Sequence, residues 1–404
     1  MKSPVPITPR PRRRLLRAGR TALSALLLCA LLACTPRESG PSPTPANTIY
    51  IDPGTGLAPT ATPTTPPTAT PTPTPTPTAT PEPTPVVYDL ESFLPTGDLH
   101  ISYTDENGVV ALETYVEYAD EAEEAVRVQH RVITRDSDSP YVQVTQCRGG
   151  QLVRTYLKPQ VGYTYNVLGS TQDEEEALLC EPVTLGTEWE VKGGTRAITA
   201  VDRIIDVSLG SYRAVEVTTR YDDGSRTVQY YVPDFGLLCE YGYAASGERT
   251  HVLEASTQES DQGFTQLIRF YFVQPYTSSI RYQSRRVTIM PNASMGSRFI
   301  NQFRTAPSGS GLITLDDVSI NSIRLDSHGY VHVDFSSSLI TTVSSIGRTS
   351  EGLLLTALAN TFCEYYQTSR MYITVNGGLY ESPYRFLMDG EYLSPDLRNV
   401  SALD

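Results

Sequence analysis

The chain has 404 residues, with 32 Lys and Arg against 45 Asp and Glu, and its formal net charge is −13 at pH 7. An acidic chain excludes nucleic acid as the expected partner, because that binding depends on neutralising phosphates, and it argues against a peripheral hold on anionic lipid. The length exceeds what one hydrophobic core normally holds, so more than one folded domain is expected.

Residues 1–33 have the pattern of a bacterial export signal. They carry seven Lys and Arg residues and no acid, followed by an apolar run over residues 21–33. This run is shorter than the ~20 apolar residues that a membrane-spanning helix needs, and it suits the apolar core of a signal peptide. Removing the signal leaves 25 basic against 45 acidic residues, a net charge of −20.

The signal ends in Leu31-Leu32-Ala33-Cys34, which resembles the lipobox of bacterial lipoproteins. In that motif a small residue precedes the cysteine that receives lipid, and Cys34 follows alanine, whereas Cys29 follows a bulky leucine. The resemblance implies that Cys34 becomes a lipid-bearing N-terminus that holds the protein on the outer side of the cell membrane. Stable anchoring requires more than one acyl chain. The alternative is an ordinary cleaved signal that happens to end in Ala-Cys.

Residues 34–86 form a Pro- and Thr-rich tether. Sixteen of the 30 prolines lie between Thr35 and Pro85. Alternating Thr-Pro excludes helices and strand ladders, because proline lacks the N–H and restricts the residue before it. We expect a disordered, extended linker at ~3.1 Å per residue, so that its core over residues 58–85 would reach ~85 Å.

Residues 87–258 are predicted to form an antiparallel β domain. Its clearest alternating segments are Ala125–Ile133, Tyr141–Thr145, Leu152–Leu157, Ala214–Thr219 and Thr227–Val232. Turn sequences at 105–108, 148–150, 192–194 and 222–224 separate such segments. Short turns between sequential strands indicate a meander, which we expect to curl into a half-barrel. The polar stretch 256–263 is the expected domain boundary.

Two signatures in this region, PVTLGTEW at 182–189 and YYVPDFGL at 230–237, resemble a domain that recurs in bacterial lipoproteins. Trp189 is the only tryptophan of the chain. It has two interpretations: it lines a ligand groove, or it packs the open end of the sheet, which is the commoner use of such a residue.

Residues 264–404 change to an α+β pattern. We expect strands at Gln266–Val273, Arg285–Ile289, Val318–Leu325, Gly329–Phe335 and Arg370–Val375, and helices at Asn292–Arg304 and Glu351–Tyr366. Asn292 or Ser294 would cap the first helix, and Thr349 or Ser350 the second. The order β-β-α-β-β-α-β predicts a sandwich with helices on one face of a small sheet.

Five stretches of this region resemble the GerMN domain of sporulation and spore-germination proteins. They are RFYF at 269–272, GYVHVDFS at 329–336, TSE at 349–351, LTALANT at 355–361 and YITVNG at 372–377. Val331, Val333 and Phe335 should alternate into the core, whereas Asp334 and Ser336 could cap the next segment. The resemblance implies a role in assembly or signalling and not in catalysis.

Nothing in the sequence predicts a catalytic centre, a cofactor or a metal ion. His328 and His332 would share a strand face with Tyr330 and Asp334, but this polar set is expected to be the solvent side of a half-buried strand. The acidic run 173–176 is expected to be a solvated loop, with calcium as a distant alternative. Buried thiols are expected at Cys239 and Cys363, and a disulfide between two of Cys147, Cys180 and Cys239 stays open.

The sequence therefore predicts a non-enzymatic, lipid-anchored protein of the cell envelope. Its partners would be other envelope proteins, or further copies of itself, bound through the GerMN-like domain, with a role in sporulation, germination or envelope signalling. The alternative is an extracytoplasmic ligand-binding lipoprotein, in which the β domain holds cell-wall glycan or lipid.

Overall fold

The computed structural model describes residues 88–122, 124–136, 140–172, 174–307 and 310–403. The expected signal peptide (1–33), the lipidation site Cys34 and the tether (34–86) lie outside these residues, so those predictions remain untested. The described residues belong to one compact unit.

The first part of this unit is a single antiparallel sheet of twelve strands, in the order β6-β5-β4-β3-β2-β1-β12-β11-β10-β9-β8-β7. A 3-10 helix precedes it: η1 (Leu90–Phe93). The strands are β1 (Leu99–Thr104), β2 (Val110–Ala122), β3 (Ala125–Thr134), β4 (Tyr141–Arg148), β5 (Gln151–Lys158), β6 (Glu176–Cys180), β7 (Glu188–Val191), β8 (Gly194–Val207), β9 (Gly210–Tyr221), β10 (Arg226–Val232), β11 (Gly236–Tyr243) and β12 (Arg249–Ser260). The predicted meander is confirmed, since all neighbours are sequential except β1 and β12.

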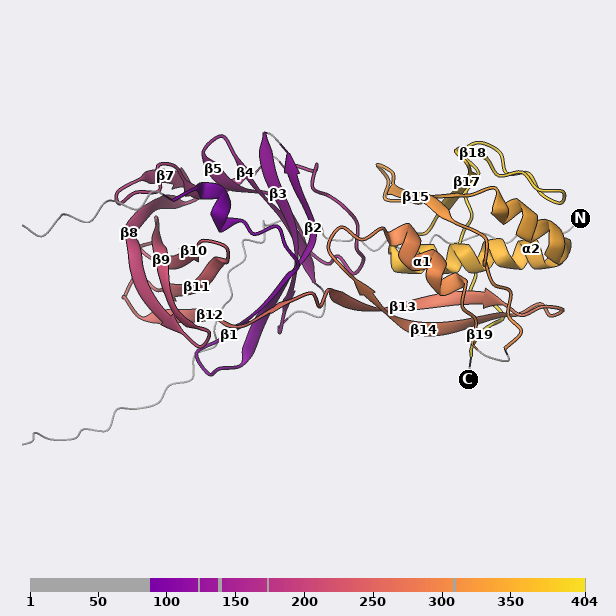
Figure 1. The fold of residues 1–404 in the computed structure, drawn as a ribbon, viewed down its shortest axis with the longest axis horizontal. Helices are drawn as coiled ribbons and strands as arrows, with labels where there is room; N and C mark the ends of the chain where they lie inside the picture. The colour runs from indigo at the N-terminus through magenta and orange to yellow at the C-terminus, as the bar shows by residue number, and fades with distance from the viewer. Residues whose placement is uncertain (1–87, 123, 137–139, 173, 308–309, 404) are drawn as a thin grey trace, which may run out of the picture. The chain divides into compact units, whose positions relative to one another are not determined.

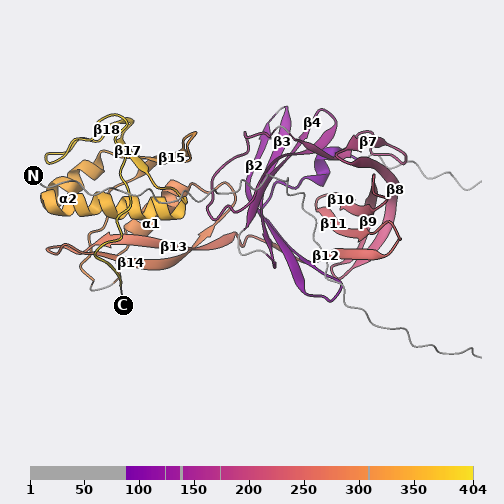
Figure 2. The ribbon, with the colours of Figure 1, turned by 180° about the vertical axis from the view of Figure 1, so that it is seen from behind.

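The sheet curls around a common interior, as Figures 1 and 2 show. Its two edge strands come together through side chains and not through a backbone ladder. The indole N–H of Trp189 on β7 donates to the carbonyl of Ala177 on β6 at 3.1 Å, and Arg196 on β8 donates to the same carbonyl at 2.7 Å. The sheet is therefore nearly closed, further than the expected half-barrel, and Trp189 holds its open end.

The second part begins directly after β12, which continues through the predicted boundary as far as Ser260. Only residues 261–263 separate it from β13 (Phe264–Val273). Gly263 has φ +62°, and a Cβ there would lie 2.8 Å from the carbonyl oxygen of Ile289. A glycine is required at this point because both the backbone conformation and the space exclude a side chain.

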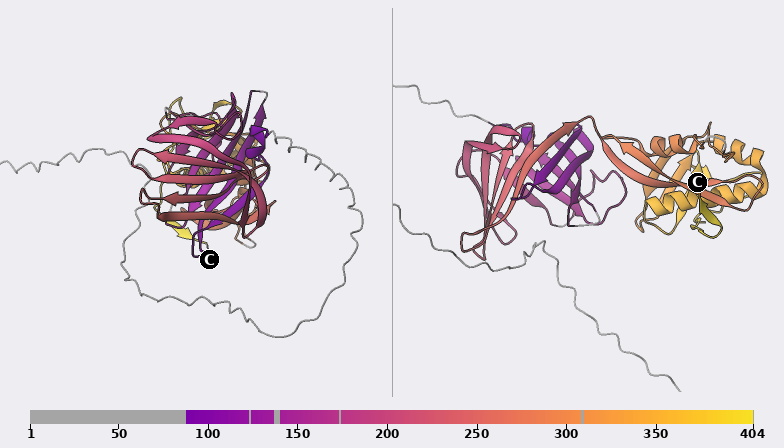
Figure 3. Two further views of the ribbon diagram at one scale, coloured as in Figure 1. Left: turned by 90° about the vertical axis from the view of Figure 1, so that its left-hand side faces the viewer. Right: turned by 90° about the horizontal axis from the view of Figure 1, so that it is seen from below.

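The remaining elements form two small sheets and two helices. They are β14 (Ile280–Ile289), α1 (Met295–Phe303), β15 (Ile320–Leu325), β16 (Val331–Phe335), α2 (Ser338–Tyr365), β17 (Met371–Val375), β18 (Gly378–Leu379) and β19 (Val400–Ala402). One sheet has the order β13-β14-β19 and the other β15-β16-β17-β18. The predicted strand and helix order is confirmed, with β18 and β19 added at its end; Figure 3 gives two further views of these elements.

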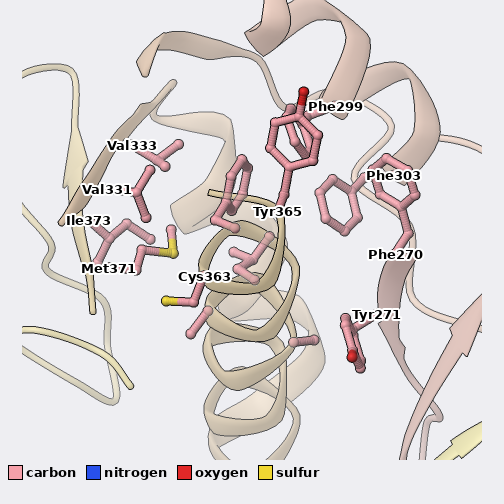
Figure 4. Packing of buried hydrophobic residues seen from close by; sticks show 14 of the residues in the cluster. Phe270, Tyr271, Phe299, Phe303, Val331, Val333, Cys363, Tyr365, Met371 and Ile373 are labelled. Carbon is pink, nitrogen blue, oxygen red and sulfur yellow. The ribbon is translucent and has the colours of Figure 1, made fainter. Parts of the chain in front are cut away.

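The expected single small sheet with helices on one face is wrong, because α2 lies between the two sheets. Figure 4 shows Val331, Val333 and Ile373 on one side of this helix and Phe270 and Tyr271 on the other. All of these residues are buried and belong to one core cluster. Each such side chain contributes about 1.5–3 kcal/mol by its removal from water.

The sequence predicted the start of α1 correctly but not the start of α2. The hydroxyl oxygen of Ser294 accepts the amide N–H of Ser297 and caps α1, whereas Asn292 has a positive φ and does not cap it. The helix α2 begins at Ser338, well before the predicted cap at Thr349 or Ser350. The helical segment before Gly347 packs because Leu339 and Val343 are fully buried.

A buried ion pair lies where the large sheet meets the second part. Nε of Arg131 on β3 donates to Glu117 on β2 at 2.5 Å, and both side chains are at most 1% exposed. The other guanidinium nitrogens donate to the carbonyls of Val161 and Tyr163 at 2.6 and 2.7 Å. Glu117 also accepts the Thr164 hydroxyl at 3.0 Å. Each nitrogen of the guanidinium thus has an acceptor, and both carboxylate oxygens of Glu117 accept hydrogen bonds, as burial of a charged pair requires.

Hydrogen bonds from the loop after β5 continue this network into the second part. The hydroxyl oxygen of Tyr365 on α2 accepts the amide N–H of Thr164 at 2.9 Å, and its proton goes to Gln266 on β13 at 2.6 Å. Gln266 in turn donates to the carbonyl of Gly162 at 3.0 Å. Nearby, the side chain of Asn292 accepts the amide N–H of Ala119 at 3.0 Å. We infer that the two parts unfold together.

Candidate interaction surface

The outer face of the β15-β16-β17-β18 sheet carries a cluster of aromatic side chains. His332 lies on β16 and Tyr372 on the neighbouring β17, with ring centroids 5.0 Å apart. Tyr392, from the segment between β18 and β19, packs against both, at 6.0 Å from the His332 ring and 5.6 Å from the Tyr372 ring. His332 is therefore largely covered, not simply solvent-facing as the alternation predicted.

An aspartate in the β15–β16 turn orients the histidine of this cluster. Nε2 of His332 donates to Asp326 at 3.0 Å, and the other carboxylate oxygen accepts the amide N–H groups of His328 and Tyr330 at 2.9 Å each. Desolvation would raise the pKa of Asp326, but the hydrogen bonds from His332 and from the two amides lower it to about 2. Asp326 is therefore a carboxylate at neutral pH, and it fixes the turn.

A cation completes the cluster. The guanidinium of Arg370 lies 5.2 Å from the ring centroid of Tyr330 and 5.8 Å from that of Tyr392. A charged group over two aromatic faces is a typical cation–π arrangement. It joins the start of β17 to the segment that follows β18.

The four residues considered together in the sequence do not form a ligand set. Asp334 is used elsewhere: one of its carboxylate oxygens accepts the Thr374 hydroxyl at 2.6 Å and the amide N–H of Gly377 at 2.8 Å. The expectation that Asp334 caps the next segment is wrong, because it ties β16 to the turn after β17. Over the described residues, no group of three or more His, Cys, Asp and Glu side chains could hold a metal ion.

Exposed apolar side chains lie in the segment between β18 and β19, and sequence reasoning missed them. Phe386 is 53% exposed, Met388 65% and Leu397 61%. The segment is fixed against the aromatic cluster, since Tyr372 donates its hydroxyl proton to Asp389 at 2.9 Å. A contiguous patch of such side chains marks a protein–protein contact site, whereas single exposed apolar residues are common on any protein surface. Their signal in the sequence was the presence of these residues in a segment with little periodicity.

The other residues singled out in the sequence have structural roles. Cys147, Cys180, Cys239 and Cys363 are free and buried, so none of them forms the disulfide that stayed open. Burial raises the pKa of Cys239 and Cys363 to about 12, as for inert core thiols. In the acidic run, Glu174, Glu175 and Glu176 each pair with an arginine or lysine.

No helix of the described residues combines the length and the apolar character needed to cross a membrane. The predicted anchor, Cys34, lies outside the described part of the chain. Neither finding tests the lipid attachment.

Comparison with known proteins confirms the resemblance of the second part. Residues 269–381 match the family model Germane, described as sporulation and spore germination. No curated protein matches the chain.

Several solved structures resemble parts of the chain. One, described as an exported protein with a YmcC-like fold from Bacteroides fragilis, is 10% identical, with a TM-score of 0.29, and the match covers 41% of this chain and 97% of that one. Another, described as a lipoprotein from Parabacteroides distasonis, is 11% identical, with a TM-score of 0.29 and coverage of 41% and 98%. The tandem GerMN domains of the sporulation protein GerM from Bacillus subtilis are 20% identical, with a TM-score of 0.26 and coverage of 34% and 47%. At these scores the likenesses assign no activity.

Proposed function

We propose that this protein is a non-enzymatic, lipid-anchored component of the cell envelope with an assembly role in sporulation or spore germination. The observation that carries the proposal is the Germane match over residues 269–381. The lipobox-like sequence ending at Cys34 and the Pro/Thr-rich tether that follows it support a position outside the cytoplasm.

The partner of the second part would be another envelope protein or a further copy of the chain. The exposed Phe386, Met388 and Leu397 offer an apolar contact surface for it. Residues 87–258 and 264–404 are proposed as two domains, with the buried ion pair of Arg131 and Glu117 near the contact between them.

Disruption of the gene tests the proposed role. We expect a lower yield of heat-resistant spores or slower germination, restored by the unaltered gene but not by one that encodes Cys34→Ala. Normal sporulation and germination together with sensitivity to envelope stress would instead support envelope signalling. Full rescue by Cys34→Ala would remove lipid attachment from the account.

Site-specific photo-crosslinking tests the partner surface in cells. A crosslinking amino acid at Phe386 or Met388 should capture an envelope protein or a second copy of the chain. The matched control is Ile204, which is 61% exposed on β8 of the large sheet and lies outside the proposed surface. Equal capture from Ile204 would show that the contact is not specific to the segment after β18.

A second candidate function, ligand binding by the twelve-stranded sheet, is favoured by one observation. The inner side of this sheet lines a partly open cavity of about 300 Å³.

A further inference from the structure

The cavity lies inside the twelve-stranded sheet, between two separate hydrophobic clusters. Val116 and Tyr231 line it from one cluster, and Ile101 and Phe235 from the other. A closed sheet of about eight strands is just filled by its own side chains, so a larger one leaves room inside. The side chains of the sheet therefore pack into two separate clusters and leave the space between them unfilled.

Most of the cavity wall is apolar and comes from strands on opposite sides of the sheet. Leu112 and Val132 contribute from β2 and β3, Leu178 from β6 and Leu253 from β12. Its volume of about 300 Å³ is at the small end of ligand pockets, which span roughly 300–1,000 Å³. An apolar space of this size suits one alkyl chain better than two.

The charged side chains at the cavity are already paired within the protein. Arg154 pairs with Glu176, which also pairs with Arg196 at 2.7 Å. Glu240 accepts hydrogen bonds from Gln229 at 2.6 Å and from His251 at 2.8 Å. A charged ligand would find no unpaired countercharge among these groups, and burying its charge would be costly.

One polar group at the cavity wall is left without a partner. Nδ1 of His130 on β3 is shielded from solvent and makes no hydrogen bond, which is uncommon for a buried nitrogen. Burial lowers the pKa of His130 to about 4, so the imidazole is neutral at neutral pH. His130 lines the cavity, but this nitrogen reaches it only when the imidazole rotates about its Cβ–Cγ bond. In that orientation it can donate to or accept from an uncharged ligand oxygen.

We propose that this cavity binds a single acyl chain with an uncharged oxygen-bearing head, as in a monoacylglycerol, and that His130 hydrogen-bonds the head. The second candidate function, ligand binding by the twelve-stranded sheet, thereby gains a class of ligand and a binding site. It does not depend on the assembly role proposed for residues 269–381, which concerns a different part of the chain.

The test uses the full chain and the apolar dye N-phenylnaphthylamine, which fluoresces when it enters an apolar site. Monolauroylglycerol should displace the dye, whereas laurate, which has the same chain and a charged head, should displace it less well. A soluble muropeptide should not displace it. Stronger displacement by laurate would refute the uncharged head, and displacement by the muropeptide would identify a glycan site instead.

Two variants locate the site, each with a matched control. Gln143→Trp fills the cavity from β4 and should abolish displaceable dye binding, whereas Leu185→Trp, at a position 67% exposed, should not. In His130→Leu, the affinity for monolauroylglycerol should fall about three- to tenfold relative to the affinity of the same variant for the dye, as expected for the loss of one hydrogen bond. His328→Leu should change neither. An unchanged affinity for monolauroylglycerol in His130→Leu, or unchanged dye binding in folded Gln143→Trp, would overturn the proposal. The first result decides the matter even if Gln143→Trp does not fold.

Discussion

Replacing Arg131 by methionine tests whether the buried ion pair holds the two parts of the fold together. The variant keeps an unbranched side chain, although a shorter one, and leaves Glu117 as a buried carboxylate that retains only neutral donors, Gln129 at 2.7 Å and Thr164 at 3.0 Å. It also frees the carbonyls of Val161 and Tyr163. Breaking a buried pair from one side costs about 3–5 kcal/mol, a large part of a domain's ~5–15 kcal/mol.

Urea unfolding with two probes measures this effect. Fluorescence of Trp189, the only tryptophan, reports on the large sheet, and circular dichroism of α1 and α2 reports on the second part. In the wild type we expect the two transitions to coincide, because the network of Arg131, Thr164 and Tyr365 joins both parts. In Arg131→Met both should move to lower urea concentration.

Two further variants control for the loss of an arginine. Arg127→Met, on the same strand, removes a partly exposed pair with Asp120 and should cost at most about 1 kcal/mol. Adding Glu117→Gln to Arg131→Met should recover part of the loss, because the stranded charge disappears. A cost below about 1 kcal/mol for Arg131→Met, or separate transitions in the wild type, would refute the reasoning.

Three other changes have defined outcomes in urea unfolding. Burial lowers the pKa of His130 to about 4, below its unfolded value of 6.5, so the free energy of unfolding should fall by about 3 kcal/mol between pH 6.5 and pH 4 as the unfolded chain takes up a proton. The wild type should therefore lose more stability than His130→Leu over this range. Parallel curves for the two proteins would contradict the burial of this imidazole. Gly347→Ala should cost about 1–3 kcal/mol, because φ +82° and ψ 164° suit glycine alone; an unchanged midpoint would mean that the kink is not required. Trp189→Phe should cost about 1 kcal/mol by removing the donor to Ala177, and no loss would show that the edges of the large sheet close without it.

The strands were predictable because alternation reports which side chains face inward. Val128 and Val132 on β3 and Val142 and Val144 on β4 are all buried, as the pattern required. The alternation does not predict how strongly the sheet curves. The near closure of the sheet depends on contacts such as that of Trp189 with Ala177, which join residues of different strands. The cavity at His130 was therefore invisible in the sequence.

The arrangement around α2 was misjudged because the helices were expected on one face of a single small sheet. Every residue from Ala357 to Cys363 is buried, so the buried surface goes all round this part of the helix. A helix that is buried all round lies between layers. The N-terminal turns of α2 were missed because serines and threonines there gave no periodicity, although Leu339 and Val343 anchor them.

The contact surface after β18 was beyond sequence reasoning for a different reason. Phe386, Leu387 and Met388 are three consecutive apolar residues, so nothing in the sequence separated the exposed Phe386 and Met388 from the buried Leu387. The structure shows that they are open to solvent because the path of the segment is fixed. The hydrogen bond from Tyr372 to Asp389 and the backbone pairing of Leu393 with Met371 hold it in place.

Mass spectrometry of the N-terminus of the protein, isolated from bacterial membranes, tests the central claim most directly. The account predicts that the mature chain begins at Cys34 with its sulfur carrying a diacylglyceryl group, and that Cys34→Ala protein is found away from the membrane. A chain that retains Met1, or one cut elsewhere and free of lipid, would contradict it.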